Sequence, residues 1–138
     1  MKKSVLFGIA AITLMACNNQ NPFLSEQNTP YGVPAFDKIK TEHYMPAFEA
    51  AIAQNKAEIE AIVSNPAEPT FENTIVALDR SGGLLEKVSG VFFNVLEADG
   101  NDEMNRIAEK VTPMLSDLSD GILLNDSLFQ RIKFVYDQ

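Results

Sequence analysis

The sequence has 138 residues, of which 46% are apolar, and a formal net charge of −8. This length fits one small domain or a piece of a larger one, and the apolar content is enough for a core, so the chain is not a disordered tail. The acidic charge argues against binding to nucleic acid and against adhesion to anionic lipid by charge, because both require basic side chains that neutralise phosphates.

Residues 1–16 differ in pattern from the rest of the chain. Lys2 and Lys3 precede an apolar run over residues 5–16, and this run is shorter than the roughly 20 residues that a membrane-spanning helix needs. A short apolar run behind a positive start is typical of a secretory signal peptide. Its removal deletes Lys2 and Lys3 and takes the net charge from −8 to −10.

The apolar run ends at Leu14-Met15-Ala16-Cys17, which resembles the lipobox of bacterial lipoproteins. The resemblance implies cleavage ahead of Cys17 and a lipid on its thiol. Cys17 is the only cysteine, so it forms no intramolecular disulfide, and the alternatives are a buried thiol or chance at an ordinary cleavage site. We therefore expect a lipoprotein anchored outside the cytoplasm. Asn18 replaces the aspartate that retains many lipoproteins in an inner membrane, which favours an outer membrane and its periplasmic face.

Residues 17–36 are rich in Asn, Gln, Pro and Gly, and we interpret them as the lipidated cysteine followed by an extended tether. Three prolines disfavour helix at the residues before them, so we expect no regular element here. The predicted organisation is a signal peptide over residues 1–16, this tether, and a helical segment over residues 37–138.

Apolar residues at helical spacing predict an amphipathic helix over residues 42–63, with Thr41 as its N-cap and residues 64–66 as its end. A second helix is predicted to begin after Thr70. Residues 81–83, a serine followed by two glycines, predict a kink or a break in it, because each glycine inside a helix costs about 1 kcal/mol relative to alanine.

Residues 84–96 are apolar around more than a narrow stripe, so we expect them to be the most buried segment. A third helix is predicted after Asn101, which serves as its N-cap. Pro113 lies inside this helix and is expected to bend or split it near Glu109, because proline removes one backbone hydrogen bond.

A final helical segment is predicted over residues 128–136, capped by Asn125 or Asp126. Sustained alternation of apolar and polar residues is absent from the sequence, so we predict an all-α fold of about four antiparallel helices, one or two of them kinked. The residues expected on inward faces are Phe48, Ile52, Ile59, Phe71, Ile75, Leu78, Val88, Phe92, Val95, Val111, Leu115 and Leu118.

Residue counts exclude most catalytic arrangements. His43 is the only histidine and Cys17 the only cysteine, so neither a two-histidine zinc motif nor a thiolate cluster is possible. We interpret His43, near a helix start, as a surface or capping residue. We predict no catalytic residue and no metal-binding residue in the chain. The acidic residues around the turn at residue 100 are interpreted as caps and solvated faces: Glu97, Asp99, Asp102 and Glu103.

A series of short motifs runs through the chain from residue 21 onwards. They are NPFL at residues 21–24, VPAFDKI at 33–39, EHYMPAFE at 42–49, NP at 65–66, PTFENTIVAL at 69–78, VFFN at 91–94 and NDE at 101–103. In this order they resemble the N-terminal region of the peptidyl-dipeptidases, also called dipeptidyl carboxypeptidases, which are relatives of oligopeptidase A and thimet oligopeptidase.

The resemblance implies a mostly helical zinc metallopeptidase that removes C-terminal dipeptides from oligopeptides inside a deep channel. Members bind zinc through an HExxH helix and a downstream glutamate, and the glutamate of HExxH activates water. None of these residues occurs here. We therefore expect this chain to be an N-terminal fragment that contributes channel-wall helices, or a truncated product, and in both cases to be inactive alone.

An alternative interpretation is a small non-enzymatic helical lipoprotein that binds a protein partner through an exposed apolar face. Both interpretations predict helices and a lipid anchor. The gene sequence beyond the codon for Gln138 separates them, because only the peptidase requires an open reading frame that reaches HExxH.

Overall fold

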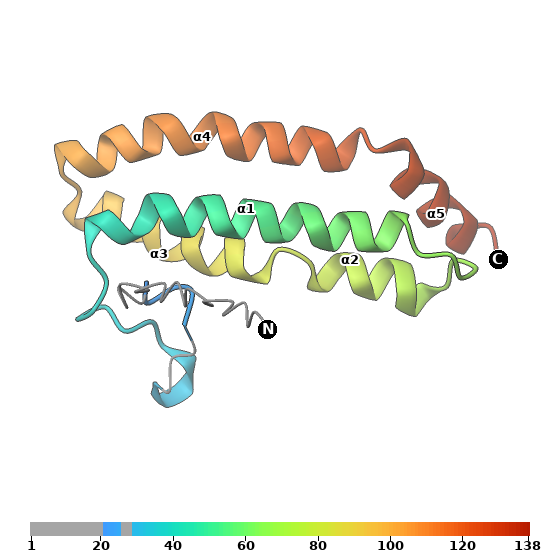
Figure 1. Cartoon of the computed structure of the whole chain (residues 1–138), viewed down its shortest axis with the longest axis horizontal. Helices are drawn as coiled ribbons and strands as arrows, with labels where there is room; N and C mark the ends of the chain where they lie inside the picture. The colour runs from blue at the N-terminus through green and yellow to red at the C-terminus, as the bar shows by residue number, and fades with distance from the viewer. Residues whose placement is uncertain (1–20, 26–28) are drawn as a thin grey trace, which may run out of the picture.

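The computed structural model describes residues 21–25 and 29–138, so the predicted signal peptide and Cys17 lie outside the described residues (Figure 1). The described part is all-α and contains no strand, which confirms the predicted fold class. Its elements are η1 (Pro30–Gly32), α1 (Thr41–Val63), η2 (Phe71–Val76), α2 (Ala77–Arg80), α3 (Gly83–Asp99), α4 (Asp102–Leu123) and α5 (Asp126–Tyr136).

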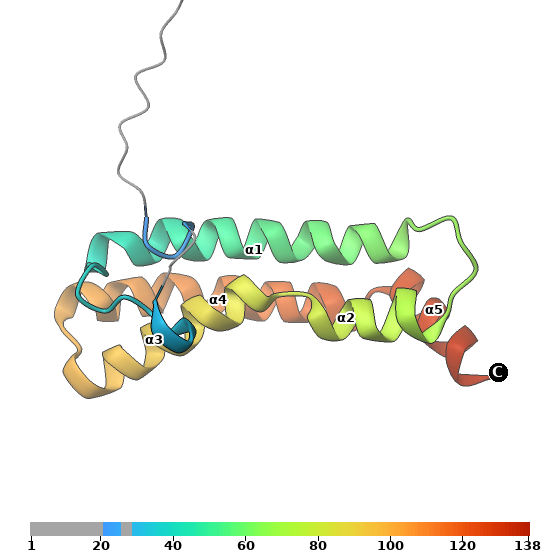
Figure 2. The ribbon, with the colours of Figure 1, turned by 90° about the horizontal axis from the view of Figure 1, so that it is seen from below.

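Helix α1 is the centre of the bundle and packs against α3, α4, α5 and α2. The pair α2–α3 runs antiparallel to α1, and α4 runs in the direction of α1; in Figure 2 α2–α3 and α4 both lie on the same side of α1 (Figures 1 and 2). The three long helices α1, α3 and α4 thus alternate in direction along the chain, so α1 and α4 are parallel. The short α5 runs across the end of the bundle where α1 finishes and contacts α1 and η2 (Figure 1).

The most buried segment is α1, so the prediction that residues 84–96 hold this place is wrong. In α3 the buried residues are Val88, Val91 and Phe92. The difference arises because α1 packs against both α3 and α4, whereas the wide apolar surface of α3 is covered mainly by α1. The buried residues of α1 are Tyr44, Ala47, Phe48, Ala51, Ile52, Asn55, Ile59 and Ile62.

Aromatic rings form the main core, at the end of the bundle where α1 begins. The rings of Tyr44 and Phe92 lie 4.9 Å apart in an edge-to-face arrangement, and those of Phe48 and Phe92 lie 5.3 Å apart. Such pairs contribute about 0.5–1.5 kcal/mol beyond the burial of their surface. Phe23 also belongs to this core, with its ring 5.5 Å from Tyr44, although the sequence placed it in a tether.

A second, smaller apolar cluster lies at the opposite end, where Ile59 and Ile62 of α1 meet Leu128 of α5. Most of the residues predicted to face inwards are buried or partly buried, but Phe71 is 64% exposed. The inward orientation of Phe71 was predicted from α-helical spacing, whereas η2 is a π-helix with more residues per turn. The side chain of η2 that faces the core is therefore Thr74, which is fully buried.

The predicted helix ends are largely confirmed. Asn101 caps α4, because its side-chain oxygen accepts hydrogen bonds from two backbone N–H groups, and Asn125 caps α5 in the same way. Pro113 does not split α4, which is continuous from Asp102 to Leu123. Pro113 and Glu109 are both exposed, so water reaches the carbonyl that the proline leaves without a donor.

The predicted break at residues 81–83 is confirmed, and contacts to α1 hold it in place. Gly82 has a φ of +77°, a conformation that glycine adopts without strain. Its backbone N–H donates to Glu58 Oε2 at 2.7 Å, and a Cβ on Gly82 would come within 3.1 Å of Asn55 Nδ2. The chain therefore turns between α2 and α3 at a point where only glycine fits against α1.

Replacing Gly82 with alanine is expected to lower the free energy of unfolding by about 1–3 kcal/mol, because alanine is strained at positive φ and crowds Asn55. Gly90→Ala is the matched control. Gly90 lies inside α3 with open space around it, so alanine there should stabilise the chain by about 1 kcal/mol. Urea unfolding followed by circular dichroism measures both, and equal effects of the two variants would contradict the role given to Gly82.

The hydrogen bond from Gly82 also predicts a pH dependence. It lowers the pKa of Glu58 below its ordinary value of 4.5, with help from the Gln54 side chain. A lowered folded-state pKa adds stability above the unfolded value, and this stability is lost as the pH falls through the folded-state pKa. Wild type should therefore be more stable than Glu58→Gln at pH 7, and the two unfolding curves should converge as the pH is lowered below 4.5. A constant difference across this range would contradict it.

Candidate functional site

The described residues contain no group of three or more His, Cys, Asp and Glu side chains placed to hold a metal ion. None of the helices in this part of the chain is both long enough and apolar enough to span a bilayer. Two polar networks stand out instead, one at each end of the bundle, and both join residues of the motifs that mark the family resemblance.

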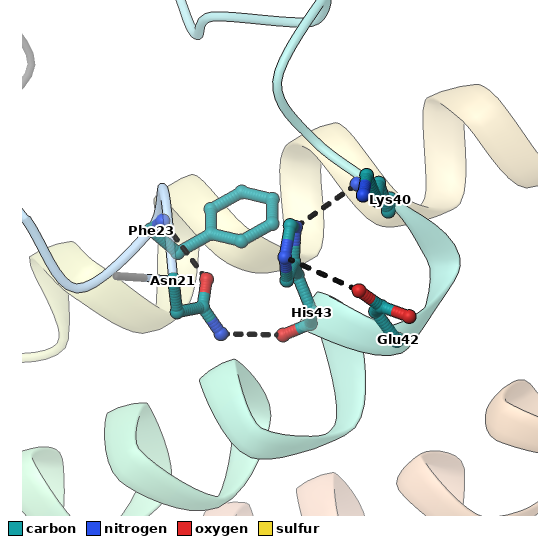
Figure 3. A network of polar contacts seen from close by, with 5 residues as sticks. All are labelled: Asn21, Phe23, Lys40, Glu42 and His43. Carbon is teal, nitrogen blue, oxygen red and sulfur yellow. Dashed lines mark hydrogen bonds and ion pairs between the residues drawn. The ribbon is translucent and has the colours of Figure 1, made fainter. Parts of the chain in front are cut away.

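The first network surrounds His43 at the start of α1 (Figure 3). The backbone N–H of Lys40 donates to His43 Nδ1 at 3.0 Å, so the imidazole caps the helix, and His43 Nε2 lies 3.9 Å from Glu42 Oε1. The interpretation of His43 as a capping residue is confirmed. Thr41 is not the N-cap as predicted, because it is already the first residue of the helix and Lys40 occupies the N-cap position. Because Nδ1 accepts this bond, the neutral imidazole carries its proton on Nε2 and has no free lone pair left to act as a base.

The same network holds the segment before α1 against the bundle. Asn21 Nδ2 donates to the backbone carbonyl of His43 at 2.8 Å, and Asn21 Oδ1 accepts from the backbone N–H of Phe23 at 3.0 Å (Figure 3). These bonds place Phe23 so that its side chain enters the aromatic core. The segment that begins at Asn21 thus joins the bundle where α1 starts.

The second network fixes the loop between α1 and η2. Arg131 of α5 is 9% exposed, and its Nη1 donates to the backbone carbonyl of Asn65 at 2.9 Å and, more weakly, to that of Ala67 at 3.5 Å. Its Nη2 donates to Asn73 Oδ1 at 3.2 Å. A buried guanidinium therefore ties α5 to a loop more than 55 residues earlier, through neutral oxygen acceptors.

Asn73 is the centre of this second network. Its Oδ1 accepts from the Thr70 backbone N–H at 2.9 Å and from Thr74 Oγ1 at 2.9 Å, and its Nδ2 donates to the Glu68 carbonyl at 2.9 Å. Thr70 Oγ1 in turn accepts from the Asn73 backbone N–H at 3.1 Å, which completes a capping box and confirms the predicted cap at Thr70. The motif PTFENT at residues 69–74 thus forms a helix N-terminus that is held by hydrogen bonds among its own residues. Arg131 binds this N-terminus through Asn73, and we call this contact the Arg131 clamp.

A surface cavity of about 380 Å³ adjoins this clamp, between α1 and α2. Asn65 and Asn73 line it together with one carboxylate, Glu58, and one guanidinium, Arg80. Glu58 stays ionised because its hydrogen bonds lower its pKa, so it does not suit the role of a general acid.

Sequence reasoning missed Arg131 and the bonding role of Asn73. The burial of Arg131 could have been predicted from the sequence. Arg131 shares an inward stripe of α5 with Leu128 and Ile132 at helical spacing. An arginine in such a stripe indicates a buried cation that needs acceptors. Which acceptors it finds depends on the fold, because they lie 58 to 66 residues away.

Comparison with known proteins agrees with the motifs. The chain is 47% identical over 118 residues to the dipeptidyl carboxypeptidase of Salmonella typhimurium and 45% identical over 118 residues to that of Escherichia coli. The chain is homologous to a region of the dipeptidyl carboxypeptidases. It is also 26% identical over 117 residues to the oligopeptidase A of Salmonella typhimurium. No family model matches the chain.

These matches cover 85–86% of this chain but only 17% of each of the three relatives. The resemblance inferred from the motifs, an N-terminal region of the dipeptidyl carboxypeptidases with oligopeptidase A as a more distant relative, is confirmed. The His43 network and the Arg131 clamp hold together the helices of this chain.

Proposed function

We propose that this chain is the N-terminal helical segment of a lipid-anchored, zinc-dependent peptidyl-dipeptidase. The observation that carries the proposal is the 47% identity to a dipeptidyl carboxypeptidase over 118 residues. In the proposed enzyme the helices form part of the channel wall, and the residues that bind zinc and activate water lie outside this segment. C-terminal dipeptides of oligopeptides are the proposed products.

Zinc does not fit the described residues of this chain. Zinc sites use three or four histidine, cysteine or carboxylate ligands. His43 uses Nδ1 to cap α1, and residues 21–25 and 29–138 bring no ligand group together. In the proposed enzyme zinc supplies activation of the attacking water, and this segment contributes shape and stability rather than ligands.

The proposed location is a membrane outside the cytoplasm, held by the lipid on Cys17. The support is the sequence pattern of residues 1–17, and Asn18 favours the periplasmic face of an outer membrane. The acidic chain is expected to stand off anionic headgroups, since the net charge of −10 on residues 17–138 is repelled by them.

The alternative, a small helical lipoprotein that binds a protein partner, has one observation in its favour. Several large apolar side chains remain exposed, among them Leu124 at 82% and Tyr136 at 87%. An enzyme in which further polypeptide covers these side chains explains them equally well, and the identity to peptidases favours the enzyme.

The proposal is tested by the length of the open reading frame and by the mass of the native protein. We expect an open reading frame beyond the codon for Gln138 that reaches an HExxH motif. We also expect a membrane protein much larger than 15.2 kDa, the mass of this chain. A stop codon directly after Gln138 and a native protein of about the mass of the lipidated residues 17–138 would contradict the peptidase and support the binding lipoprotein.

A further inference from the structure

We propose that the α5 end of the bundle is the surface by which this segment docks against the rest of the peptidase. This inference rests on the proposed function and names the interface that it requires. We call this surface the α5 end face. It is defined by the exposed apolar residues Phe71, Leu123, Leu124, Phe129 and Tyr136, which lie on or next to α5 and η2.

The side chains of the α5 end face point away from the core. Helix α5 uses one stripe, with Leu128 and Arg131, to pack on the bundle. Phe129 and Tyr136 are seven residues apart, so they share a second side of the same helix, and they are 56% and 87% exposed. Leu123 and Leu124 at the turn before α5 are 76% and 82% exposed. Large apolar side chains exposed on α5 and on the turn before it are typical of an interaction site.

Protein, rather than lipid, is the occupant that the geometry favours. Asn21 is bonded to the start of α1, and four residues of extended chain from Cys17 reach at most about 14 Å. The α5 end face lies at the other end of α1, which has 23 residues and is therefore about 35 Å long (Figures 1 and 2). The lipid anchor thus holds the bundle by the end remote from this face.

The remainder of the peptidase fits this face better than a second copy of the chain does. The matched region is 17% of the dipeptidyl carboxypeptidases, so more than four fifths of their length has to be placed around it. Two copies that each carry a net charge of −10 repel one another. Helix α5 together with its C-cap is electrically balanced, because Arg131 and Lys133 offset Asp126 and Asp137, so its end face does not repel an apolar protein surface.

The test uses the full reading-frame product with two pairs of substitutions. Leu124→Glu with Phe129→Glu places charges on the α5 end face. Leu24→Glu with Val33→Glu is the matched control, because these two apolar residues are 49% and 50% exposed and precede α1, at the opposite end. Docking predicts that the first pair speeds tryptic release of the N-terminal segment about tenfold and adds an earlier melting transition, while the control pair behaves as wild type.

Several results would overturn the docking inference. They are unchanged proteolysis and melting of the first pair, equal effects of both pairs, and a discrete homodimer of the wild-type product that the first pair abolishes. Vesicle binding by the non-lipidated product that the first pair abolishes would assign the face to lipid and overturn it as well. Dipeptide release by wild type is measured separately. If the N-terminal segment of wild type resists tryptic release but the protein releases no dipeptides, the proposed activity is rejected and the docking interface stands.

Discussion

Replacing Cys17 with alanine should move the protein from the membrane fraction to the soluble fraction. The sequence around Cys17 implies that its thiol carries a diacyl group, and each buried methylene contributes about 0.8 kcal/mol. One acyl chain gives only reversible binding, whereas two give stable anchoring, so the loss of all chains should change the partition almost completely. Cell fractionation with mass spectrometry of the N-terminal peptide measures this effect.

Asn18→Ala is the control for Cys17→Ala, because it changes the neighbouring residue and leaves the thiol in place. This variant should remain in the membrane fraction. An N-terminal peptide of unmodified mass in wild type, or a Cys17→Ala protein that stays with the membrane, would contradict the assignment of residues 1–17 as a lipoprotein signal.

Replacing Arg131 with methionine should lower the free energy of unfolding by about 2 kcal/mol. The substitution keeps most of the side-chain volume but removes the donors that satisfy the carbonyls of Asn65 and Ala67 and the side chain of Asn73. Hydrogen bonds from a charged donor contribute about 1.5–3 kcal/mol, and relief of the cost of burying the guanidinium offsets part of the loss. Urea unfolding measures the total effect.

Arg80→Met provides the comparison for the clamp. Arg80 is 75% exposed, and its guanidinium lies 3.8 Å from Glu72, so its loss should cost less than about 1 kcal/mol. Hydrogen exchange measures the local effect. The amides of residues 65–74 should exchange faster in Arg131→Met than in wild type, and at the wild-type rate in Arg80→Met. Equal stability of the two variants would show that Arg131 does not clamp the loop.

Local sequence signals determine most of the fold. Capping residues and the glycine pair define the ends of helices, and the apolar spacing defines which side faces inwards. These signals act over one or two helical turns, so they can be recognised in the sequence without the tertiary structure. Thr70, Asn101 and Asn125 cap helices as predicted, and the helix breaks at Gly82.

The remaining features depend on contacts between distant segments. Phe23 enters the core only because Asn21 bonds to His43, and the acceptors of Arg131 come from a loop about 60 residues away. The π-helical turn of η2 shifts the inward position from Phe71 to Thr74, which α-helical spacing does not predict. Composition does not show which helix contacts all the others, so the greater burial of α1 is not predicted from the sequence.

Release of C-terminal dipeptides tests the central claim most directly. The assay compares the full reading-frame product with the 138-residue chain on the same oligopeptide, with the products identified by mass spectrometry. We expect dipeptides from the full product and none from the 138-residue chain, in which His43 caps α1 and the described residues bring no three metal ligands together. Dipeptide release by the 138-residue chain alone, or none from the full product, would contradict it.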